Sequence, residues 1–214
     1  MNKKMNKKMN NIDHIYYINL DKRIDRKHEF EAQIPIFFNE IKDNVERFPA
    51  IFNSNGAIGC CSSHIEVLKK ARTQGYKYII IFEDDFQFIV TNTIFYNNIH
   101  KLFELVNNGL DFKVVMLSYN ALNKLHYNDL LDISTNVQTA SGYLVNCKYI
   151  DELINCLENG LDMFYKTGKH WLYTNDQSWK TLQQDNKWFL FKERIGIQRP
   201  SFSDLGGCFV DNKC

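Results

Sequence analysis

The sequence has no long apolar run, little proline and glycine, and almost no excess of charge of either sign. No apolar stretch approaches the roughly 20 residues needed to cross a bilayer, so we expect no transmembrane segment. With 3 prolines and 10 glycines in 214 residues, no Pro/Gly/Ser-rich linker divides the chain. Its 26 basic and 25 acidic side chains give a net charge of +1, whereas nucleic-acid binders usually carry a basic excess. A soluble protein that binds no nucleic acid is therefore expected.

The N-terminus also lacks the apolar core of a signal peptide. The basic, polar segment 1–11 is followed by apolar residues that Asp13 and His14 interrupt. Because a secretory signal needs an uninterrupted apolar stretch, we expect a cytoplasmic protein, with peripheral membrane or virion association as the alternative. We predict a disordered polar tail at 1–11, one domain at 12–205 and a C-terminal tail at 206–214.

The six cysteines show no CxxC spacing. This absence argues against a structural zinc site. In a chain of this size without a secretion signal, reduced thiols are the expected state.

Strand-like and helix-like segments alternate along the chain. Residues 78–82 form an unbroken apolar run, which is typical of a strand buried on both faces of a parallel sheet. The helix before it is predicted between a cap at Asn55 and a stop at Gly75. Further strands are predicted at 14–19, 114–117, 143–146 and 188–191, and further helices at 23–33, 93–106, 148–157 and 176–184, the last capped by Asn175. This alternation predicts an α/β fold with a mainly parallel sheet.

Three consecutive acidic residues, Glu83, Asp84 and Asp85, follow the buried strand. In open α/β sheets ligands bind beyond the carboxyl ends of the strands. If the backbone stays extended, Glu83 and Asp85 project to one side, where they repel unless one is protonated or a cation lies between them. Oxygen ligands of this kind suit magnesium or manganese. The alternative is an acidic turn that is simply solvated.

Two other candidate segments leave alternatives open. Arg23 and Arg26 lie three apart after the first strand, so they could share a helix face and reach a phosphate or a base, or form ion pairs with neighbouring acids. Asp176 could be functional or could be a favourable charge at a helix start. Ser63 and His64 are adjacent on a helix and point in different directions, which excludes a nucleophile–base pair. No P-loop and no GxGxxG fingerprint occurs.

Five segments in order resemble glycosyltransferase family 25, the family of bacterial lipopolysaccharide and lipooligosaccharide galactosyltransferases and animal procollagen galactosyltransferases. They are INLDKRIDR (18–26), NGAIGCCSSHIEVLKKA (55–71), IIIFEDD (79–85), TASGYLVN (139–146) and GIQRPSFSD (196–204). The match covers almost the whole predicted domain. It departs from the family pattern at Ala57, where Glu is usual, and in the looser spacing of 139–143.

The resemblance implies a GT-A fold, a Rossmann-like single domain that binds a nucleotide sugar and Mn²⁺ or Mg²⁺. It implies inverting transfer of a hexose, with galactose from UDP-galactose as the commonest case, to a glycan, glycoprotein or hydroxylysine-type acceptor. The metal ligands would be Glu83 and Asp85. The substrate-binding residues would be Asn19, Leu20, Arg23, Arg26, Gly56, Gly59, Ser63, His64, Asp84, Gln198 and Ser201.

An inverting transferase also needs a base for the acceptor hydroxyl. The resemblance implies Asp176 as the first candidate, and Asp204 as its competitor or as a third metal ligand. The acceptor would meet loops within 113–136 and 161–175. The alternatives are a catalytically silent relative that binds glycans or nucleotides, and a magnesium-dependent phosphohydrolase.

Overall fold

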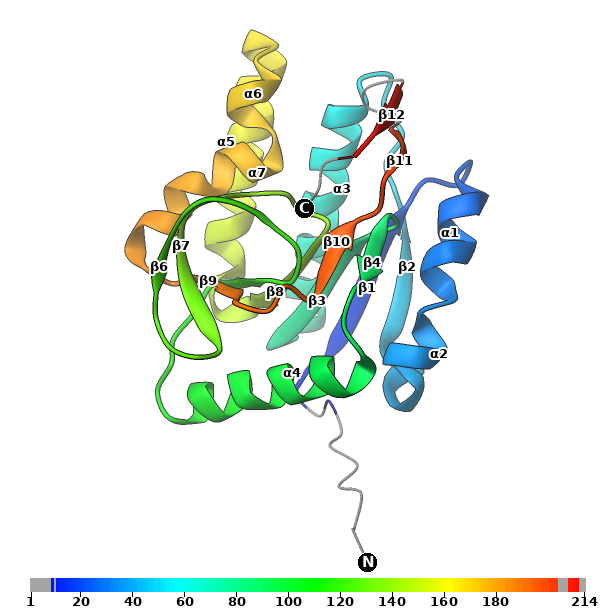
Figure 1. Cartoon of the computed structure of the whole chain (residues 1–214). Helices are drawn as coiled ribbons and strands as arrows, with labels where there is room; N and C mark the ends of the chain where they lie inside the picture. The colour runs from blue at the N-terminus through cyan, green and yellow to red at the C-terminus, as the bar shows by residue number, and fades with distance from the viewer. Residues whose placement is uncertain (1–8, 10, 204–207, 212–214) are drawn as a thin grey trace, which may run out of the picture.

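The described residues build an eight-stranded sheet with the strand order β2-β1-β3-β8-β5-β9-β7-β6 (Figure 1). The computed structural model describes residues 9, 11–203 and 208–211. The strands are β1 (His14–Asn19), β2 (Val45–Pro49), β3 (Tyr78–Glu83), β5 (Val114–Met116), β6 (Asn120–His126), β7 (Leu131–Gln138), β8 (Gly142–Asn146) and β9 (Trp188–Phe191). Two small antiparallel pairs stand apart from it: β4 (Phe86–Phe88) with β10 (Gly196–Gln198), and β11 (Ser201–Ser203) with β12 (Cys208–Val210).

The α/β class predicted from the sequence is confirmed, and its sheet is mixed. Strands β2, β1 and β3 are parallel neighbours, as are β5 and β9. Strand β8 runs antiparallel to both β3 and β5, and the hairpin β6–β7 joins β9 antiparallel. All residues of β8 are buried, as is typical of parallel strands, because helices cover both faces of the sheet here.

Helices lie on both faces of the sheet and bury alternate residues of its central strands. They are α1 (Ile24–Glu31), α2 (Ile34–Phe37), α3 (Gly56–Gln74), α4 (Asn92–Asn107), α5 (Ile150–Thr167), α6 (His170–Tyr173) and α7 (Asn175–Ser178), with 3-10 turns η1 (Asn39–Asn44), η2 (Cys147–Tyr149) and η3 (Trp179–Asp185). On β3, Ile80 and Phe82 pack on the face that α1, α2 and α4 cover. Ile79 and Ile81 pack on the face that α3 and α5 cover.

Helix α3 begins and ends where the sequence predicts. The Asn55 side chain accepts a hydrogen bond from the Ala57 backbone N–H, which caps one of the unpaired donors of the first turn. Gly75 ends the helix with φ 69°, a left-handed conformation that glycine adopts without a Cβ penalty. These two ends fix the N-terminal turn of α3 beside the ends of β1 and β3.

The segment 176–184 is helical, as predicted, but it is not one continuous α-helix. The short α7 gives way to η3, and Thr174 rather than Asn175 occupies the N-cap position. Tertiary packing overrides the helical pattern here, because Trp179 is fully buried against Trp188. The predicted acceptor loop at 113–136 contains β5, β6 and most of β7. No helix in the described ranges is long and apolar enough to span a membrane.

Candidate functional site

A cavity of about 230 Å³ lies beyond the ends of β1 and β3, against the first turns of α3. This is the edge of the sheet at which α/β proteins bind ligands. The predicted site residues on its wall are Leu20, Arg23, Arg26, Gly56, Gly59, Ser63, His64, Glu83, Asp84, Asp85, Gln198 and Ser201. The fold therefore brings together four segments that are far apart in the sequence.

Arg26 holds the two aspartates of the acidic triplet. Its Nη1 lies 3.1 Å from Asp84 Oδ1 and 2.9 Å from Asp85 Oδ2. Its Nη2 donates to Ser201 Oγ at 2.6 Å, and Gln198 Nε2 donates to Asp85 Oδ2 at 3.1 Å. All three charged side chains are at most 12% exposed, so this ion-pair network is buried.

One carboxylate oxygen of Asp85 has no hydrogen-bond partner among the described residues. Its Oδ1 is buried and accepts no hydrogen bond from any described residue. Burial and the charge of Glu83 raise the pKa of Asp85 to about 7, against the opposing effect of Arg26. A buried carboxylate oxygen without a partner, near other acids, is a position that a cation would stabilise. The residues present thus fit a hard divalent ion.

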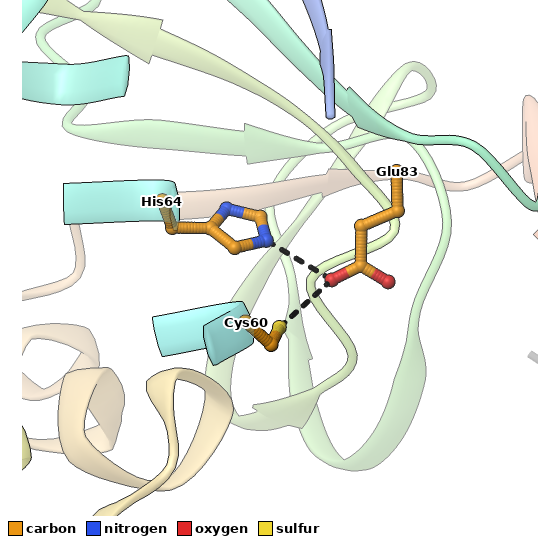
Figure 2. A group of neighbouring side chains, drawn as sticks. All are labelled: Cys60, His64 and Glu83. Carbon is orange, nitrogen blue, oxygen red and sulfur yellow. Dashed lines mark hydrogen bonds and ion pairs between the residues drawn. The ribbon is translucent and has the colours of Figure 1, made fainter. Parts of the chain in front are cut away.

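Glu83 is held from a different side. Its Oε1 lies 3.0 Å from His64 Nε2 and 3.5 Å from Cys60 Sγ, both on α3 (Figure 2). Burial acts to raise the pKa of Glu83, but the hydrogen bond and charge of His64 outweigh it, so that pKa lies below its ordinary value. The predicted alternation of side chains does not extend past Glu83, because β3 ends there and Asp84 and Asp85 form a turn.

Asn19 lies behind the cavity wall. Its side chain is 1% exposed, and its Nδ2 donates to Asp84 Oδ2 at 2.7 Å and to the Arg23 carbonyl at 3.0 Å. Asn19 was predicted to bind substrate. In the structure it does not line the cavity, and its amide orients Asp84. Its place at the end of β1 explains this, since the β1 and β3 ends are parallel neighbours.

The glycine turn of α3 supports the loop on the opposite wall. Ser63 Oγ accepts from the Ile51 N–H at 2.8 Å and donates to the Gly59 carbonyl at 2.7 Å. A Cβ on Gly59 would lie 2.5 Å from the Ile51 carbonyl oxygen and 3.2 Å from the Asn53 nitrogen. Only glycine allows the loop to approach this closely.

Gly59→Ala is therefore expected to lower the free energy of unfolding by about 1–3 kcal/mol, the usual cost of overpacking, and to weaken ligand binding in the cavity. Urea unfolding and ligand titration measure the two effects. Gly75→Ala is the control: its φ of 69° makes it costly for stability, but nothing lies within 4 Å and it is away from the cavity. Equal ligand binding in both variants would contradict the role assigned to Gly59.

Of the two candidate bases, the structure describes Asp176 but not Asp204. Asp176 is half-buried and is not among the residues that line the cavity. Its Oδ1 accepts a hydrogen bond from Thr174 Oγ1 at 2.9 Å, and its charge raises the pKa of Cys60, after the larger effects of burial, Glu83 and Cys61. Asp204 lies outside the described residues.

The site residues that escaped prediction from the sequence include Cys60 and Tyr143. Cys60 faces Glu83, and Tyr143 OH lies 2.7 Å from His64 Nδ1. Cys60 could have been predicted, because Cys60 and His64 lie four apart on a predicted helix and therefore share a helix face. No spacing rule links Tyr143 to His64 across the fold. The described cysteines Cys60, Cys61, Cys147, Cys156 and Cys208 are free, as expected.

Solved structures with similar folds include glycosyltransferases. A glycosyltransferase involved in the glycosylation of the major capsid of PBCV-1 matches with a TM-score of 0.56 and 6% identity, over 89% of this chain and 93% of that one. The glycosyltransferase GlyE of Streptococcus pneumoniae TIGR4 matches with a TM-score of 0.45 and 10% identity, over 85% of this chain and 45% of that one. The first likeness supports the GT-A-like fold expected from the sequence.

A comparison with curated proteins finds no match. The family model of glycosyltransferase family 25 (LPS biosynthesis protein) matches residues 12–165, which is more than half of the chain and includes the acidic triplet, the α3 glycine turn and the first motif. The chain belongs to glycosyltransferase family 25.

Proposed function

We propose that this chain is a metal-dependent, inverting glycosyltransferase that moves a hexose, with galactose as the expected sugar, from a UDP-sugar to a hydroxyl of a glycan or glycoprotein. The carrying observation is the buried Asp85 carboxylate, whose Oδ1 lacks a hydrogen bond from the described residues, on the wall of a cavity rich in cationic side chains. A nucleoside diphosphate and a divalent ion together complement these charges.

Cationic groups favour a diphosphate in this cavity. Lys22, Arg23, Arg26 and Arg199 line it together with the first turn of α3. A long helix presents unpaired N–H groups and a partial positive charge at its N-terminus, which is a ready binding site for phosphate. We propose that the sugar diphosphate lies between this turn and the acidic triplet.

Glu83 and Asp85 would hold the Mn²⁺ or Mg²⁺ ion, and Asp84 its waters or the ribose. When bound, such an ion supplies positive charge that stabilises the departing diphosphate. Arg26 fixes the orientation of Asp84 and Asp85 through its shared Nη1. His64 fixes that of Glu83.

Asp176 is the base that we propose for the acceptor hydroxyl, with Asp204 as the competing candidate. Thr174 Oγ1 donates to its Oδ1 at 2.9 Å and the Thr139 N–H to its Oδ2 at 3.4 Å, so its carboxylate is held in one orientation. A base in this role takes the proton as the hydroxyl oxygen attacks the anomeric carbon from the face opposite the diphosphate.

Release of UDP from UDP-galactose and UDP-glucose, with and without a mixture of glycan acceptors, tests this function. Asp176→Asn should lower the acceptor-dependent rate about 10²–10⁴-fold, the usual contribution of general base catalysis. Asp162→Asn, an exposed acid paired with Lys166 on α5, is the control and should leave the rate unchanged. Donor binding without UDP release would favour the silent relative. Phosphate release that needs no acceptor would favour the phosphohydrolase.

A further inference from the structure

A thiol, an imidazole and a carboxylate converge on one wall of the cavity. Cys60 and His64 lie four apart on α3, so they share a helix face, and Glu83 ends the adjacent strand β3 (Figure 2). Their sulfur, nitrogen and oxygen atoms all lie within 4.8 Å of one another. We propose that Cys60, His64 and Glu83 form a binding site for Zn²⁺, which shares Glu83 with the oxygen site proposed at Glu83 and Asp85.

The spacing of the three ligand atoms suits a tetrahedral ion. Zinc bonds of about 2.0–2.3 Å at tetrahedral angles place ligand atoms roughly 3.3–3.6 Å apart. Glu83 Oε1 lies 3.0 Å from His64 Nε2 and 3.5 Å from Cys60 Sγ. Small side-chain shifts therefore admit the ion, and coordinate bonds replace the two hydrogen bonds.

The imidazole already has the outer partner that a metal-bound histidine requires. His64 is 1% exposed, and its Nδ1 lies 2.7 Å from the Tyr143 hydroxyl. With zinc on Nε2, the Nδ1–H donates to the Tyr143 oxygen, and this bond fixes the tautomer and the ring plane. The Cys60 proton leaves to solvent as the sulfur–zinc bond forms. Thiolate and carboxylate then balance the charge of the ion.

The ligands that the two sites do not share differ in chemical type. Thiolate and imidazole select zinc or cobalt, whereas carboxylate oxygens and water suit magnesium and manganese. Asp84 and Asp85 are held by Arg26 on the other side of Glu83. The missing CxxC pattern argues against a closed structural zinc site, but not against a site with three protein ligands.

The fourth coordination position faces the cavity, because Cys60, His64 and Glu83 all line it. Zinc sites with three protein ligands keep this position for water or for an oxygen of a bound molecule. The molecule that occupies this fourth position would therefore bind zinc through a phosphate or hydroxyl oxygen. The zinc site does not depend on which nucleotide sugar the cavity binds.

Titration of the metal-free, full-length protein with Co²⁺ tests the site. A thiolate-to-cobalt charge-transfer band in the near ultraviolet and visible bands of tetrahedral cobalt should appear, saturate at one ion per chain and vanish on adding Zn²⁺ but not Mg²⁺. Cys60→Ser should lose the charge-transfer band. Cys156→Ser, whose thiol contacts Ser178 and Thr181 away from the cluster, is the matched control and should keep it.

A wild-type protein without the band, or a folded Cys60→Ser variant that retains it, would overturn the site. Circular dichroism checks the fold, and Cys60→Ala replaces Cys60→Ser if the serine variant fails to fold. Asp85→Asn separates the two metal proposals: it should keep the cobalt band and lose the manganese-dependent binding of the UDP-sugar. A cobalt band that disappears in Asp85→Asn would contradict a zinc site that does not use Asp85.

Discussion

Asp85→Asn is expected to reduce hexose transfer more than about 100-fold, because even outer partners of metal ligands change metal affinity or activity 10–100-fold. The substitution keeps the shape of the side chain and removes the negative charge beside the unpaired Oδ1. The neutral amide still reaches Gln198 and Arg26, so the cavity should keep its form. The measurement is the rate of UDP release at saturating Mn²⁺, with manganese affinity from calorimetry.

Asp25→Asn is the control for this variant. Asp25 pairs with Arg23 near the cavity, but its side chain is 61% exposed and it is not among the cavity-lining residues. We expect less than a twofold change in its rate, since exposed ion pairs contribute little. An Asp85→Asn enzyme as active as the Asp25→Asn enzyme would contradict the metal-binding role.

Arg26→Ala should lower the free energy of unfolding by about 3–5 kcal/mol, the cost of removing one partner from a buried ion pair. The substitution leaves Asp84 and Asp85 buried without their shared cation, and Ser201 loses its donor. Urea unfolding measures the loss. Arg72→Ala, which removes an exposed pair with Asp151 (side chains 47% and 74% exposed), should cost less than about 1 kcal/mol.

The cost of Arg26→Ala should also depend on pH. Burial raises the pKa values of both aspartates in the wild-type protein, against the opposing effect of Arg26, so removing Arg26 should raise them further. A raised folded pKa makes the protein most stable below the unfolded value, near 4, and less stable as pH rises through the folded value. The difference in free energy of unfolding between Arg26→Ala and the wild type should therefore be largest at pH 8 and become smaller toward pH 4. A difference that does not change with pH would contradict the ion-pair account.

The elements with strong apolar patterns were predictable from the sequence, and the exposed ones were not. Strand β3 is an unbroken apolar run, and α3 carries a capping Asn and a stop glycine. Strand β6 is mostly exposed and has register shifts against β7, so its residues resemble those of a loop. The antiparallel direction of β8 depends on the path of the whole chain, which no local pattern encodes.

The composition of the site was predictable in outline because its motifs follow strand ends and open a helix. Its pairings were not. Arg26 was predicted to reach a phosphate or a base, yet it also bridges Asp84 and Asp85, which follow it by more than 50 positions. The turn after Glu83 changes which acids share a side. The role of Asp204 stays a prediction.

The central claim is that the cavity binds a UDP-sugar with a divalent ion, and thermal unfolding of the purified protein tests it most directly. A ligand at about 100 times its dissociation constant adds roughly 2.7 kcal/mol, which corresponds to about 5–10 °C for a chain of this size. We predict that UDP-galactose or UDP-glucose raises the midpoint only with Mn²⁺, and that Asp85→Asn abolishes the shift. No shift with any nucleotide sugar, with or without Mn²⁺, would contradict it.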